Sequence, residues 1–402
     1  MVTKEGFSKG FEAYLKFMVD REASDLYFSV GAPVNVRIEG VTAALDEPVI
    51  TTKLLNELIE CILSSEQVHE YREKMEMNLS FALEDLGRFR VNVYRQRGEP
   101  AMVIRYIKTR IPSIEQLNLP PILKELIMAP RGLILVVGAT GSGKSTTLAS
   151  MIDHRNSNKT GHILTVEEPI EFVHGHKRSI VDQREVGLDT LSYGNALKNA
   201  MREAPDVILI GEIRDEETMR HAITYSETGH LCLSTLHANN ANQTLDRIVN
   251  FFPEGAHHQL LQDLGANLKA VISQRLVMGV DGKRLPVVEI MLNSLHVADL
   301  IAKGEFEGIK QAMEHSEFSG MCTFDQCLFD LFQNGQISED VALGNADSRN
   351  NVHVNIQLAK GKRDDEDIKH LFLHGEDAHD ELEHNKDASG GVTYPQRKAG
   401  EK

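Results

Sequence analysis

The segment Gly138–Thr146, GATGSGKST, matches the pattern G-x-x-x-x-G-K-[ST]. An apolar stretch, LILVV, precedes it, and a helix-forming stretch, STTLASMI, follows. Glycines in such a loop let main-chain N–H groups curl around phosphates, and the start of the helix adds partial positive charge. We expect Lys144 to reach the β- and γ-phosphates and Ser145 to bind Mg²⁺. The pattern therefore predicts a nucleotide-binding loop rather than a glycine-rich turn without a ligand. The predicted binding residues are Gly138, Ala139, Thr140, Gly141, Ser142, Gly143, Lys144, Ser145 and Thr146.

Two further apolar stretches end in carboxylates: DVILIGE in Glu212, and HILTVEE in Glu167 and Glu168. Ligands of open α/β sheets bind at the carboxyl ends of the strands. We expect Glu212 to hold the metal directly or through water, unless it only caps the next turn. Glu167 is predicted to polarise the attacking water, since phosphoryl transfer depends on positioning and charge. Because neighbouring strand residues point to opposite faces, we expect only one of Glu167 and Glu168 to enter the pocket.

The stretch HLCLSTLH carries a histidine at each end, His230 and His237. It is typical of a fourth strand of the same sheet, so His237, at its carboxyl end, is expected to face the nucleotide. An imidazole there suits a γ-phosphate sensor, because it donates a hydrogen bond and its charge responds when a phosphate leaves. His230 is expected to act across an interface or in the turn. For each histidine the alternative is a purely structural residue.

Arginines that could neutralise a transition state are less obvious. In the nucleotide-binding half, Arg214 and Arg220 are the candidates. Nearer the N-terminus, GRFRVNVYRQRG places Arg88 and Arg90 on one face of a predicted strand, and Arg105 follows on the next strand. A basic face of this kind suits arginine fingers that act on a neighbouring subunit's nucleotide. A solvated strand face fits the same pattern equally well.

The elements that position these residues change character near Pro121. Before it, the pattern predicts a small α+β domain with neighbouring antiparallel strands. Its predicted helices are residues 5–22 and 51–77, and its predicted strands are DLYFSV, NVRIEG, NLSFALED, GRFRVNVYRQRG and PAMVIRYI. After Pro121, continuously apolar stretches alternate with helical ones, which predicts a parallel sheet covered on both faces. From Ala256 to Leu343 we expect helices interrupted by one strand, PVVEIML.

Domain boundaries follow from these changes in composition. We expect an N-terminal domain, a linker, a nucleotide-binding domain with a helical C-terminal part, and an acidic tail, at residues 1–107, 108–120, 121–360 and 361–402. The tail is charged and poor in aliphatic residues, so we expect it to be disordered. Metal binding through its histidines, or docking of IKHLFLHG on a partner, is the alternative.

Composition excludes several classes of protein. The net charge of −16 argues against a protein that coats nucleic acid, because phosphate binding needs clustered Lys and Arg. The cysteines form no C-x-x-C pair, so neither a zinc ribbon nor a disulfide framework is indicated. The first residues show no apolar signal region, and no apolar run is long enough to span a bilayer. We therefore expect a soluble cytoplasmic protein.

Taken in order, the motifs resemble those of the secretion ATPases that power type II secretion and type IV pili. They are similar to that family's Walker A motif, Asp box (TVEEPIEF), Walker B motif (PDVILIGEIRD) and His box (TGHLCLSTLHANNA). Other stretches, including QREVGLDT, KGEFEGIKQAM and NADSRNN, resemble the pilus-retraction branch, PilT/PilU, and its PilU type most of all. The assembly branch usually carries an upstream domain and a four-cysteine insert, which this sequence lacks.

This resemblance implies a fold and a mechanism. The fold would be a PAS-like α+β domain followed by a RecA-like P-loop ATPase domain. The protein would form a hexameric ring at the cytoplasmic face of the inner membrane, with ATP held between the N-terminal domain of one subunit and the ATPase domain of the next. Arginine fingers would be Arg90 and Arg105, catalysis would fall to Glu167, and His-box roles to His230 and His237. The implied partners are an inner-membrane platform protein and a sister PilT-type ATPase, and not nucleic acid.

Two positions depart from the family pattern. Glu168 stands where the family usually has Asp, and LHVADLIAKGE replaces the retraction motif of PilT proper, AIRNLIRE. The favoured function is an ATP-driven motor that drives or assists pilus retraction. The alternatives are an accessory subunit that binds ATP without hydrolysing it, and a nucleic-acid translocase. Intact Lys144, Glu167 and Glu212 favour catalysis, while the net charge of −16 and the absence of Trp disfavour a translocase.

Overall fold

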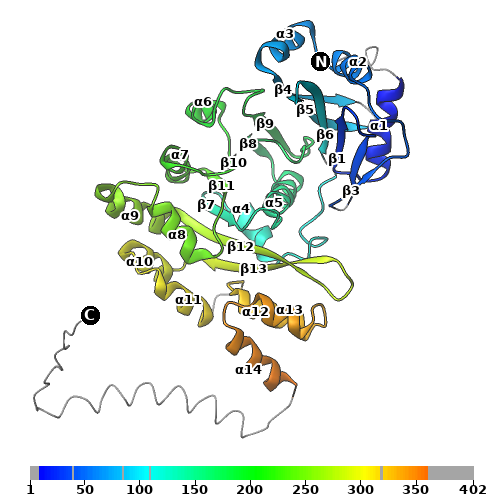
Figure 1. Cartoon of the computed structure of the whole chain (residues 1–402). Helices are drawn as coiled ribbons and strands as arrows, with labels where there is room; N and C mark the ends of the chain where they lie inside the picture. Colours follow the sequence, from blue (N-terminus) through cyan, green and yellow to red (C-terminus); the bar gives the residue numbers. More distant parts are fainter. Residues whose placement is uncertain (1–8, 39, 84–85, 108–109, 317–319, 361–402) are drawn as a thin grey trace, which may run out of the picture. The chain divides into compact units, whose positions relative to one another are not determined.

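The computed structural model shows a chain that divides into two compact units, one ending at Cys327 and the other beginning at Leu328 (Figure 1). The described residues are 9–38, 40–83, 86–107, 110–316 and 320–360. The predicted tail, 361–402, and residues 108–109 of the predicted linker lie outside these ranges. The domain boundaries proposed from the sequence stay a prediction.

The N-terminal part contains an antiparallel sheet in the order β3-β2-β1-β6-β5-β4. Its strands are β1 (Asp25–Ser29), β2 (Asn35–Ile38), β3 (Val41–Ala44), β4 (Glu76–Leu83), β5 (Gly87–Gln96) and β6 (Glu99–Ile107), and its helices are α1 (Lys9–Asp20), α2 (Thr52–Ile62) and α3 (Ser65–Lys74). Phe89, Val91 and Val93 of β5 are buried in one core with apolar residues of α1 and α2. Since strand side chains alternate, Arg88 and Arg90 lie on the opposite face of β5, as the sequence pattern predicts.

Two features of this part differ from the sequence prediction. The expected helix over residues 51–77 is two helices, α2 and α3, separated at Leu63 and Ser64. The Ser64 hydroxyl accepts a hydrogen bond from the Gln67 main-chain N–H, and the Gln67 side chain accepts one from the Ser64 N–H. This reciprocal cap starts a new helix and so ends continuity with the first. The exposed strand β3 was not predicted at all.

The central sheet has the order β13-β12-β7-β11-β10-β8-β9. Its strands are β7 (Gly132–Val137), β8 (Gly161–Glu167), β9 (Ser179–Glu185), β10 (Val207–Ile210), β11 (Leu231–Leu236), β12 (Leu268–Met278) and β13 (Arg284–Leu292). All neighbouring strands from β12 to β9 are parallel, and β13 pairs antiparallel with β12. Every residue of β7, β10 and β11 is buried, which confirms the predicted parallel sheet with both faces covered.

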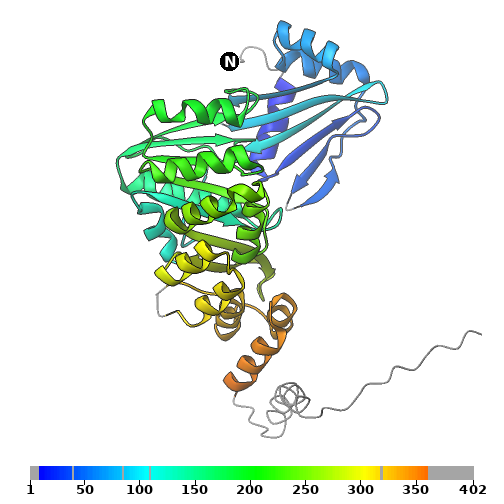
Figure 2. The ribbon, with the colours of Figure 1, turned by 90° about the vertical axis from the view of Figure 1, so that its left-hand side faces the viewer.

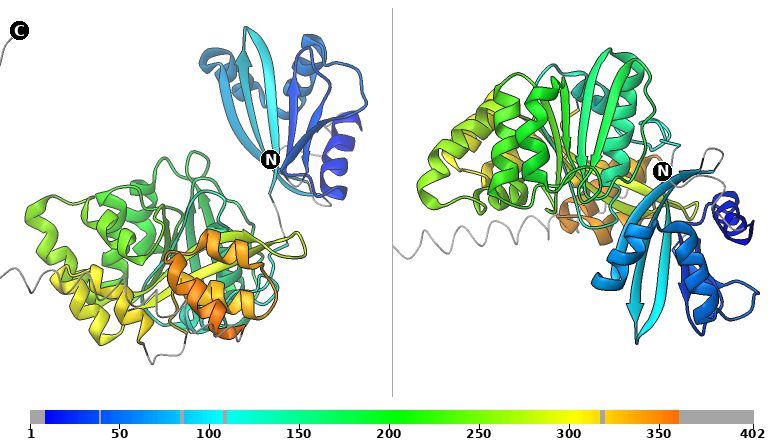
Figure 3. Two further views of the ribbon diagram at one scale, coloured as in Figure 1. Left: turned by 60° about the horizontal axis from the view of Figure 1, so that its bottom comes forward. Right: turned by 90° about the horizontal axis from the view of Figure 1, so that it is seen from above.

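Helices cover the two faces of this sheet (Figures 2 and 3). One face packs against α4 (Ile122–Met128) and α5 (Lys144–Asn158). The other packs against α6 (Tyr193–Ala200), α7 (Glu216–Glu227), α8 (Ala241–Val249), α9 (His257–Asn267), α10 (Leu295–Lys303) and α11 (Glu307–Glu314). The side chains of β7 alternate between these two cores, with Leu133 and Leu135 in one and Ile134 and Val136 in the other.

The remaining helices are α12 (Phe324–Gln333), α13 (Glu339–Asn345) and α14 (Arg349–Ala359), and short 3₁₀ turns occur at Met201–Glu203 and Glu254–Ala256. In the second unit, Lys360 forms an ion pair with Glu339 of α13. Within the described ranges, no helix combines the length and the apolar content that crossing a membrane requires.

Strands β9 and β12 correct the sequence prediction. Only one strand was expected between Ala256 and Leu343, but β12 forms a second one within that range. Its central residues, including Val271 and Ile272, are buried between β7 and β13, so ladder hydrogen bonds and burial outweigh the helix-forming character of the surrounding residues. Strand β9 was not predicted because it is an edge strand with mixed polarity, VDQRE.

Candidate nucleotide-binding site

The glycine-rich loop joins β7 to α5. Gly138 has φ 152° and Gly143 has φ 93°. A Cβ at Gly138 would lie 2.4 Å from the main-chain oxygen of Gln274. A Cβ at Gly143 would lie 2.7 Å from Nε2 of the Gln274 side chain. Only glycine fits so close to β12. Helix α5 starts at Lys144 without a side-chain cap on its first N–H groups, which leaves them available to an anion.

A cavity of about 480 Å³ opens above this loop, at the carboxyl ends of the parallel strands. Of the residues predicted from the sequence, its lining contains Thr140, Gly141, Gly143, Lys144, Ser145, Thr146, Glu167, Glu212 and His237. Gly138, Ala139 and Ser142 belong to the loop but not to this lining. The buried Ser142 hydroxyl has no hydrogen-bond partner in the described part of the chain. A polar loop with glycines held close to β12 and N–H groups at a helix start fits a phosphate chain.

Lys144 supplies the cation of the loop. Its ammonium donates hydrogen bonds to the main-chain oxygens of Gly138, at 2.9 Å, and Ala139, at 3.0 Å. Burial lowers the pKa of Lys144, while the nearby carboxylates of Glu212 and Glu171 raise it. The net effect lowers the pKa of Lys144, because burial outweighs the two carboxylates, and its main-chain contacts hold the lysine at the loop with Glu212 and Glu171 nearby.

Glu212 follows β10 and has a nitrogen partner at each carboxylate oxygen. Its Oε2 lies 2.7 Å from Arg214 Nε, and its Oε1 lies 3.1 Å from His237 Nε2. Arg214 also pairs with Glu168, at 3.1 Å. The register between β10 and β11 explains the His237 contact, because both strands end at the same edge of the sheet. Glu212 is therefore fixed in place, with a carboxylate oriented by groups on both sides.

Glu167, the last residue of β8, lies in a different environment. Its Oε1 accepts hydrogen bonds from Thr165 Oγ1, at 2.7 Å, and from Gln183 Nε2, at 3.2 Å. Burial raises the pKa of Glu167 to about 7, although both hydrogen bonds and a main-chain hydrogen bond oppose the shift and the nearby Glu171 adds to it. A carboxylate with a pKa close to neutrality is suited to taking a proton from water.

The prediction that only one of two adjacent acids enters the pocket is wrong. Both Glu167 and Glu168 line the same cavity. Strand β8 ends at Glu167, so the alternation of side chains along a strand no longer applies to Glu168. In this cavity, Glu168 forms an ion pair with Arg214.

His230 and Arg220 lie away from this cavity. His230, before the start of β11, contacts Thr228 Oγ1 in the preceding turn, at 3.1 Å, and the main-chain oxygen of Tyr225 in α7, at 3.2 Å. Arg220 pairs with Glu216 within α7. Neither lines the cavity, so within one chain His230 is a turn residue and Arg220 is a helix-surface residue.

The arginines of the N-terminal sheet form a basic face. Arg90 lies directly opposite Arg105 in the pairing of β5 and β6. Arg105 Nε lies 2.8 Å from Oδ1 of the buried Asp25, and Arg88 donates to Ser80 Oγ at 3.0 Å. Among the described residues Arg90 has no ion-pair partner. None of the three lines the cavity described above.

Sequence reasoning missed several contributors. Arg284 of β13 and Tyr193 of α6 line the cavity, and Gln274 of β12 holds Thr147 Oγ1 at 2.7 Å beneath the loop. Burial raises the pKa of Tyr193, which keeps its phenol a hydrogen-bond donor. Gln274 and Arg284 lie on a hairpin whose strand β12 was not predicted. The apolar, β-branched run LKAVISQRLVM was the signal that would have revealed it.

Comparison with known proteins gives this site its context. The sequence profile of the type II/IV secretion system protein family matches residues 6–317, and the chain belongs to this family. It is 47% identical to the type IV pilus ATPase PilU of Pseudomonas aeruginosa over 362 residues. The matched region covers 90% of this chain and 94% of PilU. It is 40% identical over 328 residues to the retraction ATPase PilT of the same organism, covering 82% of this chain and 95% of PilT.

Solved structures agree. The crystal structure of the pilus retraction motor PilT with bound ADP matches with a TM-score of 0.78 and 40% identity, over 83% of this chain and 96% of that chain. The Legionella pneumophila ATPase DotB matches with a TM-score of 0.71 and 26% identity, over 84% of this chain and 95% of DotB. The chain is therefore a nucleotide-binding ATPase of the PilT/PilU branch. Its fold is the expected one, with an N-terminal strand domain and a RecA-like ATPase core.

The raised pKa of Glu167 predicts how hydrolysis depends on pH. The carboxylate must be ionised to accept a proton, and it is protonated below about pH 7. We expect kcat/KM for ATP to fall on the acid side with an apparent pKa of about 7. Steady-state rates across this range, at saturating Mg²⁺, measure it.

Binding of Mg²⁺-ATP measured at each pH corrects for titration of the nucleotide itself. An acid limb near the ordinary glutamate value of 4.5 would show that Glu167 is not the group that limits the rate.

Proposed function

We propose that this ATPase is a motor that uses ATP hydrolysis to drive or assist type IV pilus retraction at the cytoplasmic face of the inner membrane. The observation that carries the proposal is the meeting of Lys144, Glu167 and Glu212 in one cavity at the edge of the sheet. An accessory protein that only binds nucleotide has no need of a Glu167 carboxylate held ready beside that loop. The relatives named above support the pilus as the system on which the motor acts.

In the proposed mechanism, the loop's N–H groups and Lys144 bind the β- and γ-phosphates. Ser145 and Glu212 are the hydroxyl and carboxylate that would hold Mg²⁺, a hard cation that prefers oxygen ligands. When bound, Mg²⁺ supplies neutralisation of the charge that develops on the phosphates. Arg214 and His237 keep the Glu212 carboxylate oriented.

Glu167 is the proposed catalytic base. It orients the attacking water and accepts a proton from it as the terminal phosphoryl group is transferred. His237 is the proposed γ-phosphate sensor. His237 contacts Glu212 and directly follows β11. A change of charge on the bound phosphates would therefore change the interactions of His237 at the end of that strand.

We further propose that the motor is a homo-hexamer in which Arg90 and Arg105 reach the nucleotide of a neighbouring subunit. Two arginines directly opposite each other in a sheet repel one another. Among the described residues, Asp25 forms ion pairs with Arg105 and Arg37 but not with Arg90. An anionic ligand would compensate both Arg90 and Arg105. In this arrangement His230 acts at the subunit interface or in its own turn, and Arg284 is a cation supplied by the same chain.

The proposed partners are a pilus platform protein of the inner membrane and a sister PilT-type ATPase. Nucleic acid is not among them, because the net charge of −16 opposes binding to a phosphate backbone. Force from hydrolysis would reach the platform protein through movement of one domain against another.

Replacing Lys144 by Ala tests the function directly. Loss of the loop cation should lower turnover by about 100-fold or more. In a strain whose own copy of the gene is deleted, the wild-type chain should restore pilus retraction and Lys144→Ala should not. Twitching zones and retraction of labelled pili provide the measurement.

Lys16→Ala, at an exposed position of α1, is the matched control and should complement normally. Normal retraction with a folded, expressed Lys144→Ala chain would reject the motor function.

Mixing inactive variants tests the shared site. Arg90→Ala should hydrolyse ATP poorly, and so should Glu167→Gln. If Arg90 acts on a neighbouring subunit, mixed rings contain some interfaces with both groups intact, so mixing should restore part of the activity. Hydrolysis per subunit, measured against the ratio of the two variants, provides the readout.

The control is a mixture of Lys144→Ala with Glu167→Gln, whose defects lie in the same cavity. These should not complement each other, because no site in a mixed ring has both residues intact on one chain. Full activity of Arg90→Ala alone would exclude the shared site and leave the nucleotide-binding loop unaffected.

A further inference from the structure

Gln183 of β9 links Glu167 to the loop that follows β8. It pairs with Thr165 in the register of the two strands, so Thr165, Glu167 and Gln183 lie on the same face. The Gln183 amide nitrogen lies 3.2 Å from Glu167 Oε1 and 2.9 Å from the main-chain oxygen of Phe172. Its amide oxygen accepts the main-chain N–H of His174 at 2.8 Å.

These contacts fix which end of the amide faces Glu167. A main-chain N–H can only donate, so the end of Gln183 at His174 must be its oxygen. A main-chain carbonyl can only accept, so the end at Phe172 must be the NH₂ group. The second hydrogen of that NH₂ group then points to Glu167. The orientation is imposed by the main chain and does not depend on the protonation of Glu167.

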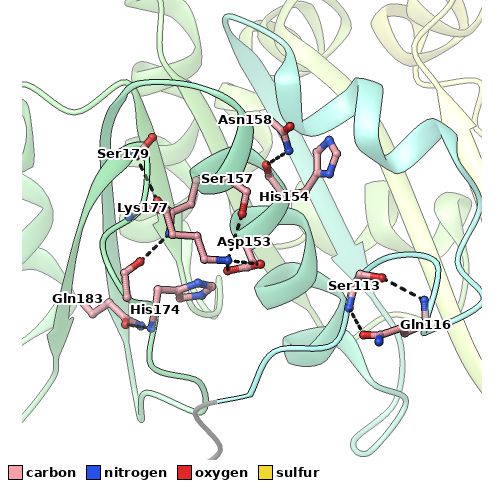
Figure 4. Close-up of polar contacts among 12 residues, drawn as sticks. Ser113, Gln116, Asp153, His154, Ser157, Asn158, His174, Lys177, Ser179 and Gln183 are labelled. Carbon is pink, nitrogen blue, oxygen red and sulfur yellow. Dashed lines mark hydrogen bonds and ion pairs between the residues drawn. The ribbon is translucent and has the colours of Figure 1, made fainter.

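The loop that holds Gln183 is itself tied to α5, the helix of the phosphate-binding loop. Asn156, fully buried on α5, donates to Gly175 O at 2.7 Å and accepts from the N–H of Lys177 at 3.2 Å. Lys177 reaches Asp153 Oδ1 at 2.6 Å (Figure 4). Figure 4 also shows the Gln183 side chain meeting the main chain at His174. Hydrogen bonds, joined by the main chain of residues 172–177, therefore connect α5 to Glu167.

We propose that Gln183 is a positioning residue for ATP hydrolysis: its amide, locked by the main chain at Phe172 and His174, holds the Glu167 carboxylate toward the attacking water. Gln183 does not line the nucleotide cavity, so it acts through Glu167 and not on the nucleotide. The inference rests on the catalytic role proposed for Glu167.

Charged groups near Glu167 increase the importance of the hydrogen bond that Gln183 donates to it. Glu168 and Glu171 lie on the loop that follows β8. Glu212, which follows β10, Tyr193 of α6 and Lys144 of α5 line the same cavity. The ring of His174 is also in the lining, and burial lowers its pKa to about 4, so it is neutral. With several carboxylates nearby, hydrogen bonds from Thr165 and Gln183 favour the ionised form of Glu167.

The test compares Gln183→Met and Gln183→Glu in the full chain with Mg²⁺-ATP as substrate. Met keeps the length and removes the donor, so kcat should fall by about 10- to 100-fold. Because Gln183 does not touch the nucleotide, affinity for ATP should stay within about twofold. The acid limb of kcat/KM should move to higher pH in Gln183→Met. It should move further in Gln183→Glu, which places another carboxylate beside Glu167.

Asp182→Asn is the matched control, because Asp182 precedes Gln183 on β9 and its side chain contacts His162 instead. It should leave kcat and the acid limb unchanged. A folded Gln183→Met enzyme with normal kcat and a normal acid limb would overturn the proposal. If Gln183→Met lowers the Tm so far that rates cannot be compared, Gln183→Glu decides, because it keeps the shape of the side chain.

Failure of this inference can be told apart from failure of the proposed function. An active Glu167→Gln enzyme would reject the role of Glu167 itself. An inactive Glu167→Gln enzyme beside a normal Gln183→Met enzyme would reject only the positioning role.

Discussion

Parallel pairing of β7, β11, β10 and β8 is the constraint on which the site depends. The register joins Val137 to Leu236, Ile210 to Ser234, and Val166 to Ile210, so the four strands end at nearly the same level. Whatever residue follows each strand must then lie at one edge. The phosphate-binding loop, His237, Glu212 and Glu167 are the residues placed there. Both faces of the sheet are buried against helices, which holds these strands in the core.

Charge at the edge is divided between two environments. Glu212 is held between Arg214 and His237, which suits a carboxylate that is oriented as a metal ligand. Glu167 is held by the neutral donors Thr165 and Gln183, and burial raises its pKa to about 7. Neighbouring carboxylates with separate environments are a general way to divide metal binding from proton transfer. Strand ends place the groups, and the residues around each decide its chemistry.

The sequence was sufficient for the parts that follow from local pattern. Apolar stretches followed by GATGSGKST, Glu212, Glu167 and His237 identified the sheet edge, because strand type and strand end are visible in short windows. Contacts that depend on which strands pair with each other could not be predicted from the sequence. Strand β12 was expected as helix, so Gln274 and Arg284 were missed, and β9 was not recognised, so Gln183 was missed. The alternation rule failed at Glu168 because it was applied one residue beyond the end of β8.

The central claim is that the carboxylate at the end of β8 carries out the hydrolytic step while the loop binds the nucleotide. The most direct measurement compares ATP affinity with single-turnover hydrolysis in Glu167→Gln and in Glu212→Ala. The account predicts that Glu167→Gln binds Mg²⁺-ATP within about twofold of the wild-type affinity and loses turnover, whereas Glu212→Ala loses affinity for Mg²⁺-ATP. Equal loss of affinity in both variants, or hydrolysis by Glu167→Gln at the wild-type rate, would contradict it.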